Sequence, residues 1–160
     1  MYSDRYLDGD LYGERLATWT ERLQRDERRF VTLIAEDMDR AIGFVHLVLD
    51  ADPTWGAHVD NLHVAHSAQR RGLGSLLLDR AARIVLERRP ASGIWLWVLE
   101  GNADAKAFYL ARGGALRDRQ LSPPPGGDPA NLQGQPWRVR VVWPDAKALL
   151  VERFSREERV

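Results

Sequence analysis

The sequence predicts one α/β (α+β) domain over residues 1–160, built on a mixed, mostly antiparallel sheet with helices against its faces. Three strand-like segments follow one another between residues 30 and 64, and their connections are too short for crossover helices. The chain then runs through a glycine loop and a helix to another strand. That strand, 94–99, is a near-continuous apolar run, as expected of a strand covered on both faces.

Residues 1–29 are expected to form a helical N-terminal segment. Leu11, Arg15, Trp19 and Leu23 fall at four-residue spacing, which predicts a helix over 11–29. Asp8 or Asp10 could cap its first turn.

Residues 30–64 alternate in the manner of strands. We expect strands at 30–35, 41–49 and 58–64, separated by a polar turn at 36–40 and a loop at 50–56. Together they form an antiparallel meander.

The second half is predicted as a core over 65–114 and two C-terminal strands over 115–160. A helix over 73–88 ends before Pro90 and Gly93, the strand 94–99 follows, and a helix over 103–112 stops at Gly113-Gly114. Strands at 115–121 and 137–143 flank a loop at 122–136 that is too rich in proline and glycine for regular structure.

Composition excludes several classes of protein. Hydrophobic residues make up 44% and charged residues 29%, so wholesale disorder is not expected. Basic and acidic residues both number 23, which argues against binding to nucleic acid or an anionic membrane. The absence of cysteine removes disulfides, thiolate nucleophiles and Cys-ligated zinc, and no metal site is expected. Without a signal-like segment or roughly 20 consecutive apolar residues, we expect a soluble, cytoplasmic protein.

The strongest local feature is the connection Gln69-Arg70-Arg71-Gly72-Leu73-Gly74 between a strand and a helix. Glycines let backbone N–H groups approach a ligand closely, and a helix N-terminus adds partial positive charge, so the connection suits a phosphate. It is not a dinucleotide fingerprint, because Leu77 stands where a third glycine would be, and it lacks the Gly-Lys-Ser/Thr of a P-loop. Taken alone, this glycine connection is explained equally well as a tight turn between a strand and a helix.

A second feature follows the strand 94–99. Asn102 suits a helix cap, and Ala105, Phe108 and Tyr109 share one face of the helix after it. An isolated tyrosine is more often a packed aromatic residue than a catalytic phenol.

The two features in this order resemble the GNAT superfamily of acyl-CoA-dependent N-acyltransferases. The first is similar to its Gln/Arg-x-x-Gly-x-Gly/Ala motif. The second is similar to its Asn-x-x-Ala-x-x-Phe-Tyr-x-x-x-Gly motif through Asn102, Ala105, Phe108, Tyr109 and Gly113. The resemblance implies that the parallel strands 58–64 and 94–99 splay apart in the middle of the sheet, and that acetyl-CoA enters the wedge between them as acyl donor.

The resemblance also implies which residues bind the donor. Backbone groups of Leu62 and Val64 would pair with the pantetheine arm, and amides of residues 71–75 would hold the pyrophosphate. The implied cofactor-binding set is Leu62, Val64, Gln69, Arg70, Arg71, Gly72, Leu73, Gly74, Ser75, Asn102, Ala105 and Phe108.

Family resemblance further implies direct transfer of acetyl to a primary amine, with Tyr109 as the acid that reprotonates the thiolate. A base, or a water relay to one, is expected on the strand before the glycine loop. Asp60 is preferred, with His58 on the same face of that strand by alternation, and Glu100 is a further candidate. An N–H near Val64 would polarise the thioester carbonyl.

Two departures from the family pattern bear on partners. Family members open with a strand and a helix ahead of the segment that matches residues 6–23, and the sequence has almost nothing there. We therefore expect 30–35 to be an open sheet edge, which a homodimer could cover. Gly114 replaces a more usual phenylalanine, and the loop 122–136 could close over a neighbour's acceptor site.

Other functions compete with this interpretation. A catalytically silent module that binds acetyl-CoA for regulation would keep the glycine loop. A hydrolase would need a Gly-x-Ser-x-Gly elbow, which is absent. Nucleic-acid binding is suggested by Arg70, Arg71, Arg80, Arg83, Arg88 and Arg89, but Asp79 and Glu87 offset them, so a solvated helix face explains them better. The acceptor, a small-molecule or peptide amine, is left open.

Overall fold

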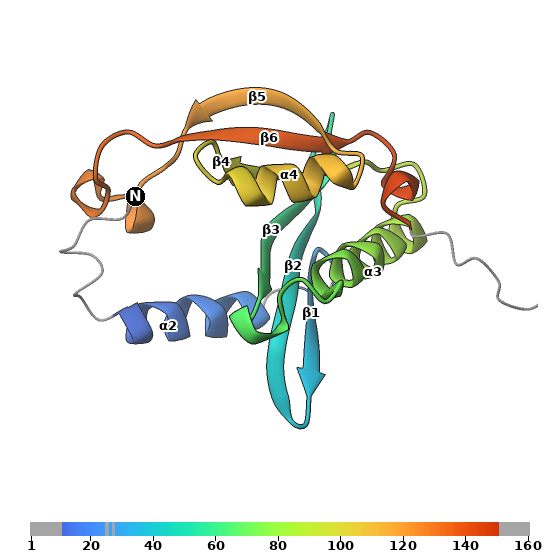
Figure 1. Cartoon of the computed structure of the whole chain (residues 1–160), viewed down its shortest axis with the longest axis horizontal. Coiled ribbons are helices and arrows are strands. Elements are labelled where there is room, and N and C mark those ends of the chain that lie inside the picture. The colour runs from blue at the N-terminus through green and yellow to red at the C-terminus, as the bar shows by residue number, and fades with distance from the viewer. Residues whose placement is uncertain (1–10, 25, 27, 151–160) are drawn as a thin grey trace, which may run out of the picture.

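The structure is a computed structural model that describes residues 11–24, 26 and 28–150. Within them, six strands form one sheet in the order β1-β2-β3-β4-β6-β5 (Figure 1). Only the β3–β4 pair is parallel, so the predicted mixed, mostly antiparallel sheet is confirmed. The strands are β1 Phe30–Asp37, β2 Arg40–Asp52, β3 Gly56–Val64, β4 Ile94–Leu99, β5 Ala115–Leu121 and β6 Trp137–Trp143.

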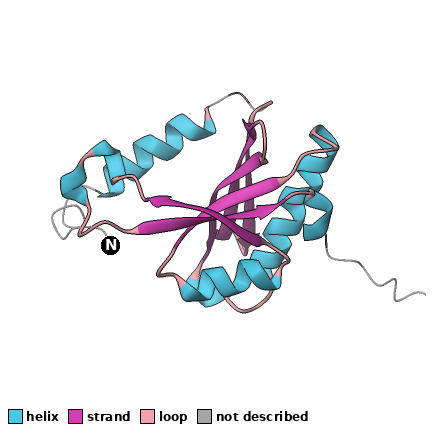
Figure 2. Ribbon diagram, turned by 90° about the horizontal axis from the view of Figure 1, so that it is seen from above, coloured by secondary structure: helices cyan, strands magenta, loops and turns pink. Residues whose placement is uncertain are grey.

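Helices lie on both faces of the sheet (Figure 2). They are α2 Leu11–Leu23, α3 Leu73–Arg88 and α4 Ala103–Ala111. The expected helix over 11–29 was too long: it ends at Leu23, and the Asp26 carboxylate accepts the Arg28 backbone N–H at 3.0 Å in a turn that leads into β1. Asp8 and Asp10, the expected caps, lie outside the described residues.

The loop 122–136 is more regular than expected. Two single 3₁₀ turns, Pro125–Gly127 and Pro129–Asn131, each begin with proline. The Asp128 side chain accepts the Ala130 N–H at 2.9 Å and so caps the second turn. Proline fixes φ near the helical value at the first position of such turns, so the residues that break long elements start short ones here.

The main core lies between α3 and one face of the sheet. Leu77, Ala81 and Val85 are buried along one face of α3, together with Leu78 and Ala82 beside them. Against them pack side chains from the strands that include Val45, Leu47, Leu49, Ile94, Leu96, Val141 and Trp143. Burying one such aliphatic side chain contributes about 1.5–3 kcal/mol to the stability of the fold, so this layer holds α3 against the sheet.

The opposite face of the sheet is covered in part by α2. The Trp19 ring meets the edges of Phe44 at 4.9 Å and His46 at 5.6 Å between centroids. His46 is 1% exposed, and its Nδ1 lies 2.7 Å from the Thr32 hydroxyl. Because a buried imidazole needs a hydrogen-bond partner, this contact lets α2 close over a polar side chain.

The parallel pair separates almost as soon as it forms. Ala57 pairs with Ile94 and His58 with Trp95, and no later residues of β3 and β4 are paired. Both strands continue beyond these pairs, so their carboxyl ends border a gap in the sheet.

At one edge of the sheet, β1 pairs with β2 alone among the described strands. Ile34 on this edge is 55% exposed. The expected open edge is therefore present, whereas its cover by a second protomer stays a prediction. No helix among the described residues combines the length and apolarity that a membrane crossing requires.

Gly114 should be intolerant of any side chain. A Cβ there would lie 2.5 Å from Val141 Cγ1 and 2.8 Å from the Trp143 ring, both in the core. We expect Gly114→Ala to lower the free energy of unfolding by about 1–3 kcal/mol, measured by urea denaturation. Gly101→Ala, where a Cβ meets nothing within 4 Å, is the matched control. Equal stability of the two variants would contradict this packing.

Candidate functional site

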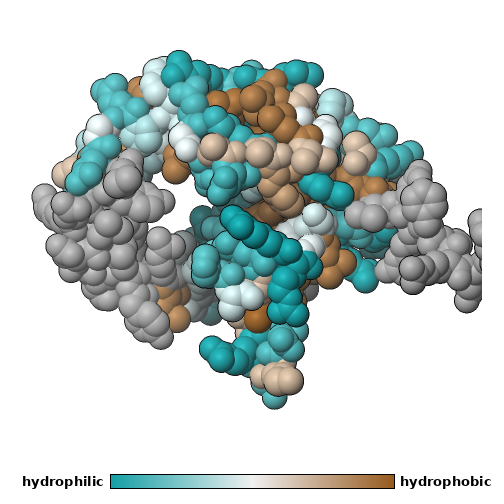
Figure 3. Space-filling view, in the orientation of Figure 1, coloured by the Kyte–Doolittle hydropathy of each residue, from teal (hydrophilic) through white to brown (hydrophobic). Residues whose placement is uncertain are grey.

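A cleft of about 790 Å³ opens where β3 leaves β4, beside the start of α3 and the length of α4. The space-filling view shows the molecule hollowed near its middle (Figure 3). The residues that line the cleft include most of the predicted donor-binding residues: Leu62, Val64, Gln69, Arg70, Gly72, Gly74, Ser75, Asn102, Ala105 and Phe108, together with Tyr109. His63, Asp104 and Ala107 also line it and were not predicted, although each is a sequence neighbour of predicted residues.

One wall of the cleft presents backbone polar groups. The Ala65 N–H donates to the Ile42 carbonyl of β2 at 2.8 Å. Because successive residues of a strand turn their peptide groups to opposite sides, those of Leu62 and Val64 point away from β2, toward the gap. The Gln69 side chain donates to the Val64 carbonyl at 3.1 Å, which leaves the Val64 N–H facing the cleft.

The glycine loop ends at the uncapped start of α3. Arg70 and Gly72 both have left-handed backbone conformations, with φ of 58° and 81°. No side chain caps the first turn of α3, so its leading N–H groups are open to a ligand. Gly74 faces the Phe108 ring, which a Cβ would approach to 3.3 Å. The loop therefore offers an anion site with little side-chain obstruction.

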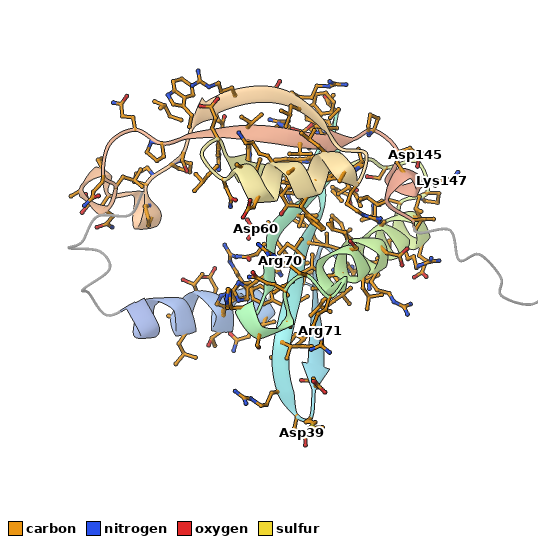
Figure 4. The ribbon with its side chains drawn as sticks, viewed as in Figure 1. Asp39, Asp60, Arg70, Arg71, Asp145 and Lys147 are labelled. Atoms are coloured by element: carbon orange, nitrogen blue, oxygen red, sulfur yellow. The ribbon has the colours of Figure 1, made fainter. Side chains whose placement is uncertain are left out.

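Two predicted loop residues lie apart from this cleft. Arg71 and Leu73 border a second groove of about 410 Å³, together with Glu36 and Asp37 of β1. The stick view shows Arg70 toward the centre of the molecule and Arg71 toward the β1–β2 hairpin (Figure 4). The side chains of these two neighbouring arginines therefore lie on different surfaces.

Tyr109 is fixed on α4 by packing on both sides. Asn102 caps the helix through its side-chain oxygen, which accepts the Ala105 N–H at 3.1 Å. The Tyr109 ring lies 5.2 Å from that of Phe108 and 6.1 Å from that of Trp143. Burial raises the pKa of the Tyr109 hydroxyl, so the phenol is protonated at neutral pH and can donate a proton.

Asp60 occupies an irregular position in β3. The ladder with β2 pairs Leu47 with Val59, and the next residue of β2, His46, pairs with Asn61. Asp60 is therefore the extra residue of a β-bulge, a feature that redirects side chains. Simple alternation was expected to place Asp60 beside His58. The bulge, not alternation, governs this part of the strand.

His58 and Asp60 nevertheless lie together on the α2 side of the sheet. His58 Nδ1 is 4.0 Å from Asp60 Oδ1, and the imidazole stacks on Trp95 at 4.0 Å. Arg22 of α2 reaches Asp60 Oδ2 at 2.6 Å, an ion pair that the sequence did not reveal. Burial lowers the pKa of His58 to about 4, outweighing the nearby Asp60 carboxylate, which raises it. His58 is thus neutral at pH 7.

Glu100 is a poor candidate for a base. Both of its carboxylate oxygens accept from Arg119, at 2.9 and 2.8 Å. This hydrogen-bonded guanidinium lowers the pKa of Glu100, which favours its ionised, paired state.

The arginines of α3 give little support to nucleic-acid binding. Arg83 pairs with Asp79 at 2.8 Å, and Arg89 pairs with Asp50 at 2.5 Å. Within the described part of the chain, no group of three His, Asp or Glu side chains could hold a metal ion.

Comparison with known proteins places the chain among acetyltransferases. The profile of the acetyltransferase (GNAT) family matches residues 3–113. A Mycobacterium tuberculosis protein named as a probable N-acetyltransferase is 36% identical over 76 residues, covering 48% of this chain and 41% of the relative. The match thus spans about two fifths of that relative's length.

Solved structures show the same fold. The ribosomal-protein-S18-alanine N-acetyltransferase of Escherichia coli matches with a TM-score of 0.62 and 23% identity, over 79% of this chain and 74% of that one. A GNAT family acetyltransferase of Elizabethkingia anophelis, with acetyl-CoA bound, matches with a TM-score of 0.63 and 14% identity, over 86% of each chain.

The half-buried, neutral His58 should make the protein sensitive to acid. Between pH 6.5 and 4 the unfolded chain binds a proton at this position that the folded chain does not, so stability falls as pH falls through this range. The shift corresponds to on the order of 3 kcal/mol at full effect. We expect His58→Gln to flatten the loss of unfolding free energy between pH 7 and 4.5, and exposed His66→Gln to leave it unchanged. An identical pH slope in both variants would refute the assignment.

Proposed function

The chain belongs to the acetyltransferase (GNAT) family, and we propose that it transfers an acetyl group from acetyl-CoA to a primary amine by direct attack of the amine on the thioester. The observation that carries the proposal is the cleft between the separated ends of β3 and β4, with open peptide groups on one wall and the start of α3 at its mouth. A structural relative that holds acetyl-CoA supports the choice of donor.

The cleft suits a long donor with one anionic end. Peptide groups of Leu62 and Val64 can pair with the amides of the pantetheine arm, as a neighbouring strand would. The open N–H groups at the start of α3 suit the pyrophosphate, with Arg70 beside them. A volume of about 790 Å³ lies within the usual range for small-molecule sites.

We place the deprotonation of the amine on the α2 side of the sheet. An alkyl amine with a pKa near 10.4 is only about one part in a thousand neutral at pH 7, so a proton must be taken up. We assign this to Asp60, directly or through a water, with neutral His58 at its side. Arg22 holds the Asp60 carboxylate from α2 and orients it toward this path.

Tyr109 and Val64 act on the thioester of the donor. As the amine nitrogen bonds to the carbonyl carbon, the Val64 N–H stabilises the charge on the carbonyl oxygen. The carbon–sulfur bond then breaks, and the Tyr109 hydroxyl donates its proton to the departing thiolate. As the amide forms, nitrogen loses its second proton through Asp60 to water, and the Tyr109 phenolate regains a proton from water. The products are an acetamide, free CoA thiol and the one proton released when the ammonium was neutralised.

A silent acetyl-CoA-binding module is the second candidate function. It is favoured by the ion pair of Glu100 with Arg119, which lowers the pKa of that carboxyl and makes it a weaker base, and by Arg22, which occupies Oδ2 of Asp60. Such a module would bind acetyl-CoA, yet no amine would accelerate release of the CoA thiol.

Calorimetric titration of acetyl-CoA tests the donor site. We expect micromolar binding, and a loss of about 100-fold or more in affinity for Gly72→Trp, because the indole would occupy the anion site. Gly127→Trp is the matched control: its φ of 78° is also left-handed and its surroundings are equally open, but it lies outside the cleft. Equal affinities in the two variants would sink the assignment of the cleft.

Tyr109→Phe tests the proton donor. General acids contribute typically 10²–10⁴-fold, so we expect kcat to fall by about 100-fold while the Kd for acetyl-CoA changes by less than about twofold. Steady-state thiol release and calorimetry provide the two numbers. An unchanged kcat would remove Tyr109 from the mechanism.

A further inference from the structure

Arg138 on β6 is a half-buried guanidinium without a carboxylate partner among the described residues. Arg22, Arg119 and Arg140, by contrast, each have a carboxylate partner. Arg22 binds Asp60, and Arg119 binds Glu100. Arg140, two residues along the same strand, lies 3.5 Å from Asp52 and 3.1 Å from Asp118. Arg138 therefore carries a positive charge that this part of the protein leaves uncompensated.

Neutral groups hold the Arg138 side chain in place. Its guanidinium carbon lies over the Trp97 ring, 4.5 Å from the centroid. With the Gln120 amide turned so that its oxygen faces the guanidinium, that oxygen accepts from Arg138 Nε at 3.0 Å and from a terminal nitrogen. Burial and the charge of Arg140 lower the pKa of Arg138, so a nearby anion would relieve both effects. The Arg138 guanidinium is thus held in one orientation, but no carboxylate among the described residues neutralises its charge.

The position of Arg138 links it to the acceptor side of the sheet. Arg138 pairs with Leu99, at the end of β4 that has separated from β3. Its ring partner Trp97 meets Trp95 edge-on at 6.0 Å, and Trp95 stacks on His58. A chain of ring contacts therefore links Arg138 to the His58–Asp60 pair, on the face of the sheet opposite α3. Trp95 in this chain is 8% exposed, and the Arg140 guanidinium lies over the rings of Trp95 and Trp97, 4.6 and 4.8 Å from their centroids.

We propose that Arg138, held by Trp97 and Gln120, binds a carboxylate of the acceptor, so that the amine substrate is one that carries a carboxylate, such as an amino acid. This rests on the proposed function. The planar guanidinium offers paired N–H donors that match a carboxylate, and such bonds are about twice as strong as neutral ones. With the carboxylate at Arg138, the amine of the substrate points toward the His58–Asp60 pair.

Matched pairs of acceptors test the proposal. Glycine, β-alanine and L-phenylalanine are each compared with their carboxamides, and kcat/KM is measured by thiol release. For wild type and variants, the acid-to-amide ratio of kcat/KM is compared, because the different basicity of the two amines then cancels. We expect Arg138→Gln to lower this ratio by about 10- to 100-fold for the preferred acid. Arg138→Lys should lower it less, because an ammonium keeps the charge without the fork.

Arg117→Gln is the control, because Arg117 is exposed on neighbouring β5 and its guanidinium donates to the Leu116 carbonyl at 3.1 Å. A ratio that is equal in wild type and Arg138→Gln, with acetylation intact, would overturn the proposal.

A binding measurement separates this proposal from the proposed function. N-acetyl-L-phenylalanine and its amide are titrated into the CoA-saturated protein and followed by NMR. Tighter binding of the acid to wild type, lost in Arg138→Gln, supports the carboxylate site even if no amine is acetylated. Equal binding of acid and amide contradicts it, whatever the activity.

Discussion

The early end of pairing between β3 and β4 is the constraint on which the site depends. Two strands that share a sheet normally satisfy each other's peptide groups along their whole length. Here the pairs stop at His58 and Trp95, so the following peptide groups of β3 face a gap. Because peptide groups away from water need partners, the gap suits a ligand with its own amides.

The separation also divides the candidate site between the two faces of the sheet. On the α3 side, the cleft brings together the open start of α3 and Tyr109 of α4. On the α2 side, the bulge of β3 presents Asp60 beside His58, and Arg22 binds it. In the proposed reaction, the donor and the acceptor approach the gap from opposite faces; the base acts on the amine and the acid on the departing thiolate.

Much of the fold could be predicted from local sequence. The strands and α3 follow from apolar periodicity, and the cleft residues from two contiguous motifs, because both signals depend on neighbours in the chain. The bulge at Asp60 has no glycine to mark it. The ion pair of Arg22 with Asp60 and the support of Arg138 by Gln120 join distant segments, so spacing could not reveal them. The end of α2 at Leu23 was missed because the Asp26 turn competes with a helical pattern.

An NMR titration of isotopically labelled protein with acetyl-CoA tests the role of the gap most directly. If the donor pairs with β3, the amide resonances of Leu62 and Val64 shift and their hydrogen exchange slows, together with those of residues 72–75. If acetyl-CoA binds while these amides are unaffected, and the changes fall instead at the groove beside Glu36 and Asp37, the account of the site is contradicted.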